Sequence, residues 1–471
     1  MISTTKQNQA PFTAILWVIA AVQFLTPFMF SAIGVALPAI GKEFFSGAVQ
    51  LGLIEMAYIL GVALLLLPVG RYADIYGRKK LFFSGAVVMT LATLALALAP
   101  TVKLLIIFRF IQGIGAAMIT STSFAILNSV CPPAERGKAT GIVVCCVYLG
   151  ISAGPILAGL MIEYLGWRWI FFSAVPVEIV ILIFAVTRLK GEWAEAAGEP
   201  FDWIGSLLYM IALFCIIIGV LEVHQLPLAK WLIGMGVFLM FLFLYYENTL
   251  RHPILPLRKI AGNRVFALSN LATWLNYAAS FGIMFFFSIY LQIIRGVSPK
   301  MTGFILIIQP LLQAACAPVA GRLADKYSPA PIATFGMILC SFGLFICTFI
   351  SATSTYFHII SILVVMGLGF GFFSTPNSTA IMASIERRDY GLASSMIATM
   401  RTYGMLTAMT LITTLLSFYL GDQPISGATA IGFIATMHSA MIIFTLLSIV
   451  GIFCSLARTN RIPSPHLQVK D

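Results

Sequence analysis

Fourteen long apolar segments, separated by short polar ones, follow one another along this chain. Crossing the hydrocarbon core of a membrane takes about 20 mainly apolar residues. The chain has 471 residues, 60% hydrophobic and 10% charged, which is more apolar surface than a soluble fold can cover. The first segment is too long for a signal peptide, and we expect it to remain as a helix. We predict an all-α membrane protein whose fourteen transmembrane helices cover residues 12–38, 50–69, 81–101, 104–130, 139–162, 167–187, 203–223, 229–247, 266–291, 301–321, 331–351, 356–384, 391–419 and 432–456.

The basic residues predict how these spans are oriented. An even number of spans places both termini on one side, so the connecting segments fall into two sets. Of the 28 Lys and Arg residues, twenty lie on the side of the termini, six on the opposite side and two inside spans. Because basic residues are retained in the cytoplasm, we expect both termini to be cytoplasmic and the protein to lie in the inner cell membrane. Although the net charge is +11, this dispersal argues against a nucleic-acid-binding face.

The sequence repeats itself at a fixed offset. Segment 68–74 recurs in looser form at 318–325, and the pair at 135–136 recurs at 386–387; both offsets are 251 positions (321 − 70 and 386 − 135). Six spans are too short to fill that distance, so we expect two extra helices between two six-helix halves. The predicted organisation is a six-helix bundle at 12–188, a linker and two-helix insert at 189–262, a second six-helix bundle at 263–457 and a cytoplasmic tail at 458–471.

The loop between the second and third spans carries a specific pattern. Gly70, Arg71, Asp74, Gly77 and Arg78 stand at spacings that resemble the signature loop of the major facilitator superfamily. The resemblance implies a cytoplasmic latch in which Asp74 supplies the acid and Arg78 a basic partner, with glycines that permit close helix approach. The alternative is a positive-inside anchor that happens to contain one Asp.

The fourth span opens with a second pattern of the same family, Arg109 followed by Gln112 and two glycines. A charge within a span costs at least about 2.5 to 3.5 kcal/mol, so it normally faces a cavity or a partner. By the resemblance, Arg109 would promote proton transfer by acting on a nearby carboxyl group. The alternative is that its long side chain reaches the membrane interface.

The fifth span contains Gly150, Gly154, Pro155 and Gly159, which resemble the antiporter signature of the drug-export branches. Glycines at four-residue spacing let helices touch backbone to backbone, and a proline inside a helix bends it. A hinge or a tight seam follows, although the same glycines also suit ordinary packing, and Ala158 replaces a glycine usual in that signature. The run also spells Gly-x-Ser-x-Gly around Ser152, but a hydrolase needs a strand, a turn and a helix there.

Further short matches are similar to the fourteen-helix drug:proton antiporter branch, a multidrug efflux type, at 36–38, 167–170, 201–205, 252–257 and 291–299. One departure matters. That branch commonly carries an Asp in the first helix, and the corresponding residues here, 27–31, contain no acid. The coupling or cation recognition that this Asp provides must therefore be absent or be supplied by another residue.

Carboxyl groups inside apolar spans are the candidates for that role, because such groups suit reversible protonation. Glu55 on the second span is favoured and Glu178 on the sixth is the weaker choice. The alternative is a carboxyl group that is hydrogen-bonded for packing or that lies near the periplasmic mouth. Arg401 on the thirteenth span, which we expect to be buried, could pair with an acid, bind an anionic substrate or serve the structure. With Arg109, these are the proton-coupling candidates.

Polar and aromatic side chains inside the spans could line a substrate cavity, although Tyr and Trp near span ends more often form an interfacial belt. The candidates are Tyr58, Gln112, Tyr148, Trp274, Asn276, Tyr277, Gln309, Gln313 and Asn377.

The leading functional hypothesis is a monomeric transporter that exports lipophilic compounds in exchange for protons, by alternating access around a midplane site. Its partners would be an amphipathic small molecule, protons and membrane lipid, with no nucleic acid. We expect no metal, cofactor or enzymatic activity, because no ATP-binding loop or catalytic constellation is present. The alternatives are a proton symporter for organic anions or metabolites on the same fold and, more remotely, a membrane sensor or enzyme that transports nothing.

Overall fold

The computed structural model describes residues 12–132, 135–189, 191–224, 226–257, 260, 262–386 and 390–458. Most of the predicted cytoplasmic tail, 459–471, therefore lies outside the described residues. So do eight of the basic residues assigned to the side of the termini: Lys6, Lys190, Arg258, Lys259, Arg387, Arg388, Arg461 and Lys470.

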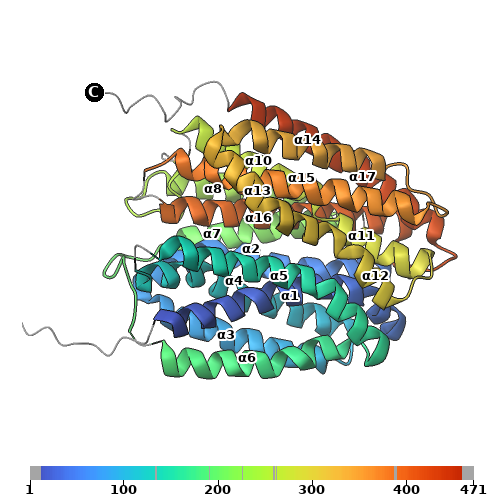
Figure 1. Cartoon of the computed structure of the whole chain (residues 1–471), viewed down its shortest axis with the longest axis horizontal. Helices are drawn as coiled ribbons and strands as arrows, with labels where there is room; N and C mark the ends of the chain where they lie inside the picture. Colours follow the sequence, from blue (N-terminus) through green and yellow to red (C-terminus); the bar gives the residue numbers. More distant parts are fainter. Residues whose placement is uncertain are drawn as a thin grey trace, which may run out of the picture. The chain divides into compact units, whose positions relative to one another are not determined.

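Helices account for all the regular structure in the described part of the chain (Figure 1), and fourteen helical stretches there are long and apolar enough to cross a membrane. The predicted fold class and number of spans are confirmed. Span nine consists of α10, α11 and a π-helix, η1, and span ten of α12 and α13. The elements are α1 (Phe12–Phe44), α2 (Ala48–Tyr76), α3 (Arg78–Ala97), α4 (Val102–Val130), α5 (Arg136–Tyr164), α6 (Arg168–Arg188), α7 (Trp203–Leu221), α8 (Ala229–Glu247), α10 (Arg264–Ser280), α11 (Ile283–Ile289), η1 (Tyr290–Ile294), α12 (Pro299–Leu306), α13 (Ile308–Lys326), α14 (Pro329–Cys347), α15 (Tyr356–Ala383), α16 (Tyr390–Leu420) and α17 (Ala430–Ala457).

Several helices begin where a short polar side chain satisfies a free backbone N–H. The side-chain oxygens of Thr101, Asp202, Asn263 and Thr355 accept hydrogen bonds from backbone amides three residues on, at 3.4, 2.9, 3.0 and 3.3 Å. Each such cap stabilises a helix by about 1 kcal/mol. These four residues therefore fix the starts of α4, α7, α10 and α15.

Two spans that we predicted to be continuous are interrupted. Pro310 has no N–H to donate to the carbonyl of Leu306, which removes one helical bond. This explains why α12 ends at Leu306 and α13 begins at Ile308. In span nine, α10 ends at Ser280, a turn follows at 281–282, and the last turns adopt the π-helix. Such π segments are rare and occur frequently at functional sites.

The chain divides into two compact units. Unit 1 comprises Met1–Leu255, Ser288–Phe304 and Gly421–Pro424, and unit 2 comprises Pro256–Phe287, Ile305–Leu420 and Ile425–Asp471. In unit 1, α1 packs on α5, α4 packs on both α2 and α3, and α3 also packs on α6. In unit 2, α15 packs on α13 and α14, and α10 packs on α16 and α17. The boundaries that we assigned to the bundles and the insert stay a prediction.

Candidate functional site

A hydrogen-bonded chain of polar side chains runs from α4 through α3 to α6 inside unit 1. Arg109 Nη1 donates to Gln112 Oε1 at 2.6 Å, and Gln112 Nε2 donates to Thr93 Oγ1 at 3.0 Å. Thr93 Oγ1 in turn lies 3.0 Å from Glu178 Oε1. Arg109 and Gln112 are both 0% exposed and Glu178 is 5% exposed. Three of the predicted site residues thus belong to one network.

Thr93 is the member that the sequence did not single out. It stands in an apolar span that contains other threonines, and neither its spacing nor its neighbours distinguish it. Its role depends on which helices face one another, so only the fold reveals it.

Arg109 also connects this network to Glu55. Its Nε donates to the carbonyl oxygen of Ile54 at 3.4 Å, and its guanidinium carbon lies 4.5 Å from the ring centroid of Tyr58. The charges of Arg109 and Glu55 attract each other. Glu55 Oε2 and Arg109 Nη2 are buried and have no hydrogen-bond partner. The coupling candidates Glu55 and Arg109 are therefore neighbours, each with unused hydrogen-bonding capacity.

Two glycines of α4 explain why these groups meet. A Cβ atom added at Gly113 would strike the backbone oxygen of Tyr58 on α2, and one added at Gly115 would lie 2.8 Å from the backbone nitrogen of Met89 on α3. Neither position tolerates a side chain at this helix separation. The glycines after Gln112 therefore let α4 touch both neighbours, which sets Arg109 beside Glu55 and Gln112 beside Thr93.

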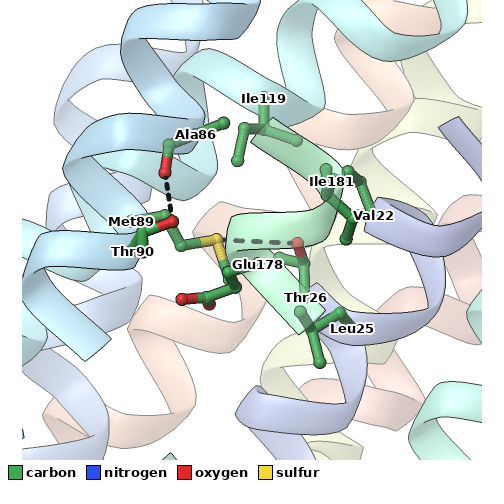
Figure 2. A pocket seen from close by; sticks show the side chains of 9 residues that line it. All are labelled: Val22, Leu25, Thr26, Ala86, Met89, Thr90, Ile119, Glu178 and Ile181. Atoms are coloured by element: carbon green, nitrogen blue, oxygen red, sulfur yellow. Dashed lines mark hydrogen bonds between the residues drawn. The ribbon is translucent and has the colours of Figure 1, made fainter. Parts of the chain in front are cut away.

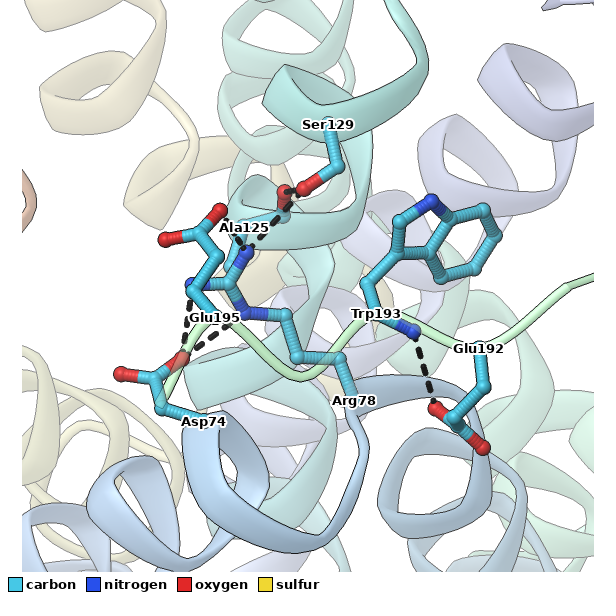
Figure 3. Close-up of polar contacts among 7 residues, drawn as sticks. All are labelled: Asp74, Arg78, Ala125, Ser129, Glu192, Trp193 and Glu195. Atoms are coloured by element: carbon cyan, nitrogen blue, oxygen red, sulfur yellow. Dashed lines mark hydrogen bonds and ion pairs between the residues drawn. The ribbon is translucent and has the colours of Figure 1, made fainter. Parts of the chain in front are cut away.

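The signature loop binds the linker that follows α6 (Figure 3). Arg78 Nε donates to Asp74 Oδ1 at 2.8 Å, while its Nη1 donates to Glu195 Oε1 at 2.6 Å and to Ser129 Oγ at 3.0 Å. Asp74 and Arg78, the predicted latch acid and base, are therefore direct partners. The second acid, Glu195, comes from a segment that we expected only to connect the first bundle to the insert.

Main-chain bonds and a second ion pair reinforce this contact. Arg78 N donates to the carbonyl of Trp193 and Ala196 N to the carbonyl of Asp74, both at 2.9 Å. Arg71 pairs with Glu199, which His252 Nδ1 approaches to 2.8 Å. The guanidinium of Arg78 holds the pKa of Glu195 below its ordinary value, and that of Arg71 does the same for Glu199. We call residues 191–199 the docked linker.

Gly77 is the glycine that this arrangement requires. Its φ of 120° lies in the region that side chains rarely adopt, and an added Cβ would come within 2.6 Å of Glu192 Oε1. That oxygen accepts a hydrogen bond from Lys79 N at 2.7 Å. Gly70 is less constrained, since its nearest neighbour would be Ser121 Cβ at 3.9 Å.

The glycines of the fifth span pack α5 against two partners in unit 1. Cβ atoms added at Gly150 and Gly154 would strike α1, the first at the carbonyl oxygen of Phe24 and the second at Ser31. One added at Gly159 would lie 2.5 Å from the carbonyl oxygen of Pro299. The carbonyl of Pro155 faces Gly303 in the same way. The close seam that we expected is present, whereas the hinge remains a prediction.

The cavity candidates fall into both units. Tyr58, Gln112 and the half-buried Tyr148 belong to unit 1. In unit 2, Trp274 Nε1 donates to Thr407 Oγ1 at 3.1 Å, and the rings of Tyr277 and Phe370 lie 5.3 Å apart. Three further candidates carry side-chain amides. Asn276 is fully buried, and neither its Oδ1 nor its Nδ2 has a hydrogen-bond partner. Gln309 Oε1 also has no partner, and Gln313 is half-buried.

Asn377 belongs to a buried cluster around Arg458. Its Nδ2 donates to Thr273 Oγ1 at 2.8 Å and to the Ser269 carbonyl at 3.1 Å, while its Oδ1 accepts from Arg458. Arg458 Nη1 also donates to Ser269 Oγ at 2.9 Å. We expected Arg401 to be the buried cation of this half. That was wrong: Arg458, which directly follows α17, is 1% exposed, whereas Arg401 is half-buried.

No group of three or more His, Cys, Asp or Glu side chains that could hold a metal ion occurs within the described ranges. The eight cysteines are free thiols. The site therefore consists of hydrogen-bonding and ionisable side chains.

Nearly the whole chain is similar in sequence to known proteins. The sequence profile of the Major Facilitator Superfamily matches residues 19–267 and 269–470. The riboflavin transporter RibZ of Clostridioides difficile is 27% identical over 82% of this chain and 84% of its own length. A multidrug resistance protein B homolog of Mycobacterium tuberculosis is 29% identical over 78% of this chain and 69% of its own. A bacterial homolog of the human lysosomal transporter Spinster, solved in an inward-facing, occupied conformation, matches with a TM-score of 0.67 at 16% identity, covering 96% of this chain and 97% of that one.

Proposed function

Because the chain belongs to the major facilitator superfamily, whose members are membrane transporters and not enzymes, we propose that it exports amphipathic organic compounds in exchange for protons. Relatives named multidrug resistance proteins support the substrate class. The predicted orientation, with both termini in the cytoplasm of an inner cell membrane, suits export. The transporter acts as a monomer and needs no cofactor other than the proton gradient.

The observation that carries proton coupling is the buried pair of Glu55 and Arg109. A charged group inside a span costs at least about 2.5 to 3.5 kcal/mol unless a partner offsets it. Arg109 donates its hydrogen bonds to neutral oxygens of Ile54 and Gln112, so Glu55 receives its attraction without a direct bond. The Glu55 carboxyl group can therefore be charged when it lies beside Arg109 and neutral when it lies farther from Arg109. That near balance is what a group needs to bind and release a proton in each cycle.

The cycle follows from this balance. A proton that binds Glu55 removes the attraction to Arg109, and the two helices that carry these residues, α2 and α4, are then free to adopt a different contact. Each proton that enters across 100 mV releases about 2.3 kcal/mol. At about 1.4 kcal/mol for each factor of ten, one proton sustains a substrate gradient of about fortyfold.

A second candidate function is proton symport of an organic anion or metabolite. The relative named riboflavin transporter supports it, as does Arg401, whose Nε is buried without a partner. The two functions differ in the direction of proton movement relative to substrate.

The experiment that tests both uses purified protein in proteoliposomes with a pH-sensitive dye inside. Lipophilic cations, neutral drugs and riboflavin are added in turn under an imposed proton gradient. Export predicts that drugs move protons in the opposite direction to themselves, and that Glu55→Gln abolishes this exchange. The matched control is Glu222→Gln, the same change at the C-terminal end of α7, which leaves it intact.

Two results would contradict the proposal. Proton movement in the same direction as riboflavin or another organic anion favours symport. Full drug exchange in Glu55→Gln, with wild-type proton flux, removes Glu55 from the coupling role while leaving export in place.

A further inference from the structure

Thr93 holds a position in which one hydroxyl proton has two possible acceptors. Its Oγ1 lies 2.9 Å from the carbonyl oxygen of Met89 and 3.0 Å from Glu178 Oε1. A hydroxyl has one proton to donate and two lone pairs to accept with. Gln112 Nε2 already donates to this oxygen at 3.0 Å. The hydroxyl therefore donates to Met89 or to Glu178, and never to both at once.

The two choices correspond to two states of the Glu178 carboxyl group. When Glu178 is ionised, Thr93 donates to it and accepts only from Gln112. When Glu178 carries a proton, its own O–H donates to Thr93, and the Thr93 proton turns to the Met89 carbonyl. The Thr93 hydroxyl proton has an acceptor in both states, so neither state leaves a buried donor without a partner.

The surroundings of Glu178 suit such a change. Figure 2 shows its carboxyl group beside Met89 and Thr90, at a cavity of about 10 Å³ lined mainly by apolar side chains of α1, α3, α4 and α6. The two hydroxyls at this cavity are already used, since Thr90 donates to the Ala86 carbonyl and Thr26 to the Met89 sulfur. Glu178 Oε2 is buried and has no partner. Thr93 is thus the side chain that responds to the charge of Glu178.

The charged and titratable groups that face Glu178 are few. Tyr58 on α2 interacts with it electrostatically, and Arg109 on α4 reaches it through Gln112 and Thr93, with Glu55 beyond Arg109. The cavity residues on α1 and α3 are uncharged. When Glu178 is ionised, each hydrogen bond of the series Arg109, Gln112, Thr93 and Glu178 is donated in the direction of Glu178.

We propose that Glu178 is a proton-binding site and that Thr93 transmits its state through Gln112 to Arg109. This deepens the proposed coupling, because Arg109 then senses two carboxyl groups: Glu55 directly and Glu178 through the hydrogen-bonded chain. Removing the proton from Glu178 aligns the chain and draws Arg109 toward Gln112. Adding the proton to Glu178 reverses the direction of the Thr93 hydrogen bond and weakens the hydrogen bond between Gln112 and Arg109. Arg109 then interacts mainly with Glu55.

The test is infrared spectroscopy of the full chain in phosphatidylcholine liposomes, with no substrate present. A protonated carboxyl group has a carbonyl stretch that disappears on ionisation, so difference spectra between acid and alkaline buffer count the groups that titrate. Wild type is expected to show a component that Glu178→Gln lacks and Glu55→Gln retains. Thr93→Val should shift that component to higher frequency, because its hydrogen bond is lost, and Thr93→Ser should leave it unchanged.

The outcomes separate this inference from the proposed function. If Glu178→Gln does not fold, the Thr93→Val and Thr93→Ser pair tests the same carboxyl group in place. Identical difference spectra for wild type and Glu178→Gln, or for wild type and Thr93→Val, overturn the inference even in a protein that exchanges drugs for protons. A Glu178 component that behaves as expected stands even if no compound in the transport panel moves protons.

Discussion

Arg78 Nη1 lies 2.6 Å from Glu195 Oε1, although 117 positions separate the two residues in the chain. The same guanidinium bonds Asp74 and Ser129, so a single side chain joins the ends of α2, α3 and α4 to the docked linker. The linker is therefore bound to the signature loop, and we expect its acids to follow any movement of that loop.

Replacing Arg78 with Lys should weaken the binding of the docked linker. A guanidinium offers five donors in a fixed plane, whereas an ammonium group cannot reach Asp74, Ser129 and Glu195 together. Exposed ion pairs contribute about 0.2 to 1 kcal/mol each, and the Glu195 side chain is 68% exposed. We expect hydrogen exchange of the linker amides, measured by mass spectrometry, to rise by less than about tenfold.

Lys138→Arg, an exchange between the same two residue types at an exposed residue of α5, is the control and should leave linker exchange unchanged. Equal linker exchange in wild type and Arg78→Lys would show that the main-chain bonds alone hold the linker.

The docked linker should also loosen in acid. The pKa values of Glu195 and Glu199 lie below their ordinary value because Arg78 and Arg71 donate hydrogen bonds to them. A depressed pKa stabilises docking fully above the ordinary value for Glu, about 4.3, and that contribution is lost as the pH falls through the lower, docked value. Linker exchange, corrected for the intrinsic effect of pH, should stay constant from neutral pH to about 5 and increase below about 4. A Glu195→Gln, Glu199→Gln double variant should lack this transition, and an unchanged transition there would assign it to other groups.

Adding one methyl group to the seam between α5 and α1 should destabilise unit 1. In Gly154→Ala the new Cβ would meet the Ser31 side chain and lie 3.0 Å from the backbone nitrogen of Ala32. Overpacking of this kind costs about 1 to 3 kcal/mol, which thermal unfolding in detergent can detect. Gly141→Ala, on the same helix, meets nothing within 4 Å and should stabilise the protein by up to about 1 kcal/mol. Equal melting temperatures for the two variants would mean that α5 and α1 move apart easily enough to accommodate the added methyl group.

Two buried asparagines of unit 2, Asn377 and Asn276, should respond differently to the same change. Asn377→Leu removes hydrogen bonds to Thr273, to the Ser269 carbonyl and to the charged Arg458. Bonds to charged groups are worth about 1.5 to 3 kcal/mol, so the variant should unfold at a lower temperature. Asn276→Leu removes an amide that has no partner, which should leave stability unchanged or raised while altering drug transport. An Asn377→Leu variant that is as stable as wild type but has an altered drug affinity would indicate that Asn377 lines the substrate cavity.

Hydropathy alone was enough to predict the helices, because a span must hide its backbone polar groups and has few ways to do so. The rotation of each helix about its own axis cannot be predicted in the same way, because a span that is apolar on every side has no periodic pattern of polar residues. This is why Arg109 and Glu178 could be suspected singly, whereas their connection through Thr93 could not. Pro310 was visible in the sequence, yet its effect on span ten depends on whether neighbours keep the helix straight.

The charged residues at helix ends were the least predictable. Glu195 and Glu199 stand in an acidic segment of the kind that normally faces water, and only the path of the linker brings them to Arg78 and Arg71. Arg458 follows an apolar run as a positive-inside anchor would. Its burial is decided by Ser269 and Asn377, which lie on two other helices.

The docked linker limits how this protein could be shortened. A twelve-helix derivative that joined α6 directly to α10 would lose Glu195 and Glu199 together with spans seven and eight, leaving Arg71 and Arg78 with Asp74 as the nearby acid. Transplanting residues 191–199 into the shortened chain, as a tether of the same length, would restore both counter-charges. We therefore expect the docked linker to support the signature loop by its own charges, whereas α7 makes a separate contact with α2, in which the Tyr209 hydroxyl donates to the Ala63 carbonyl.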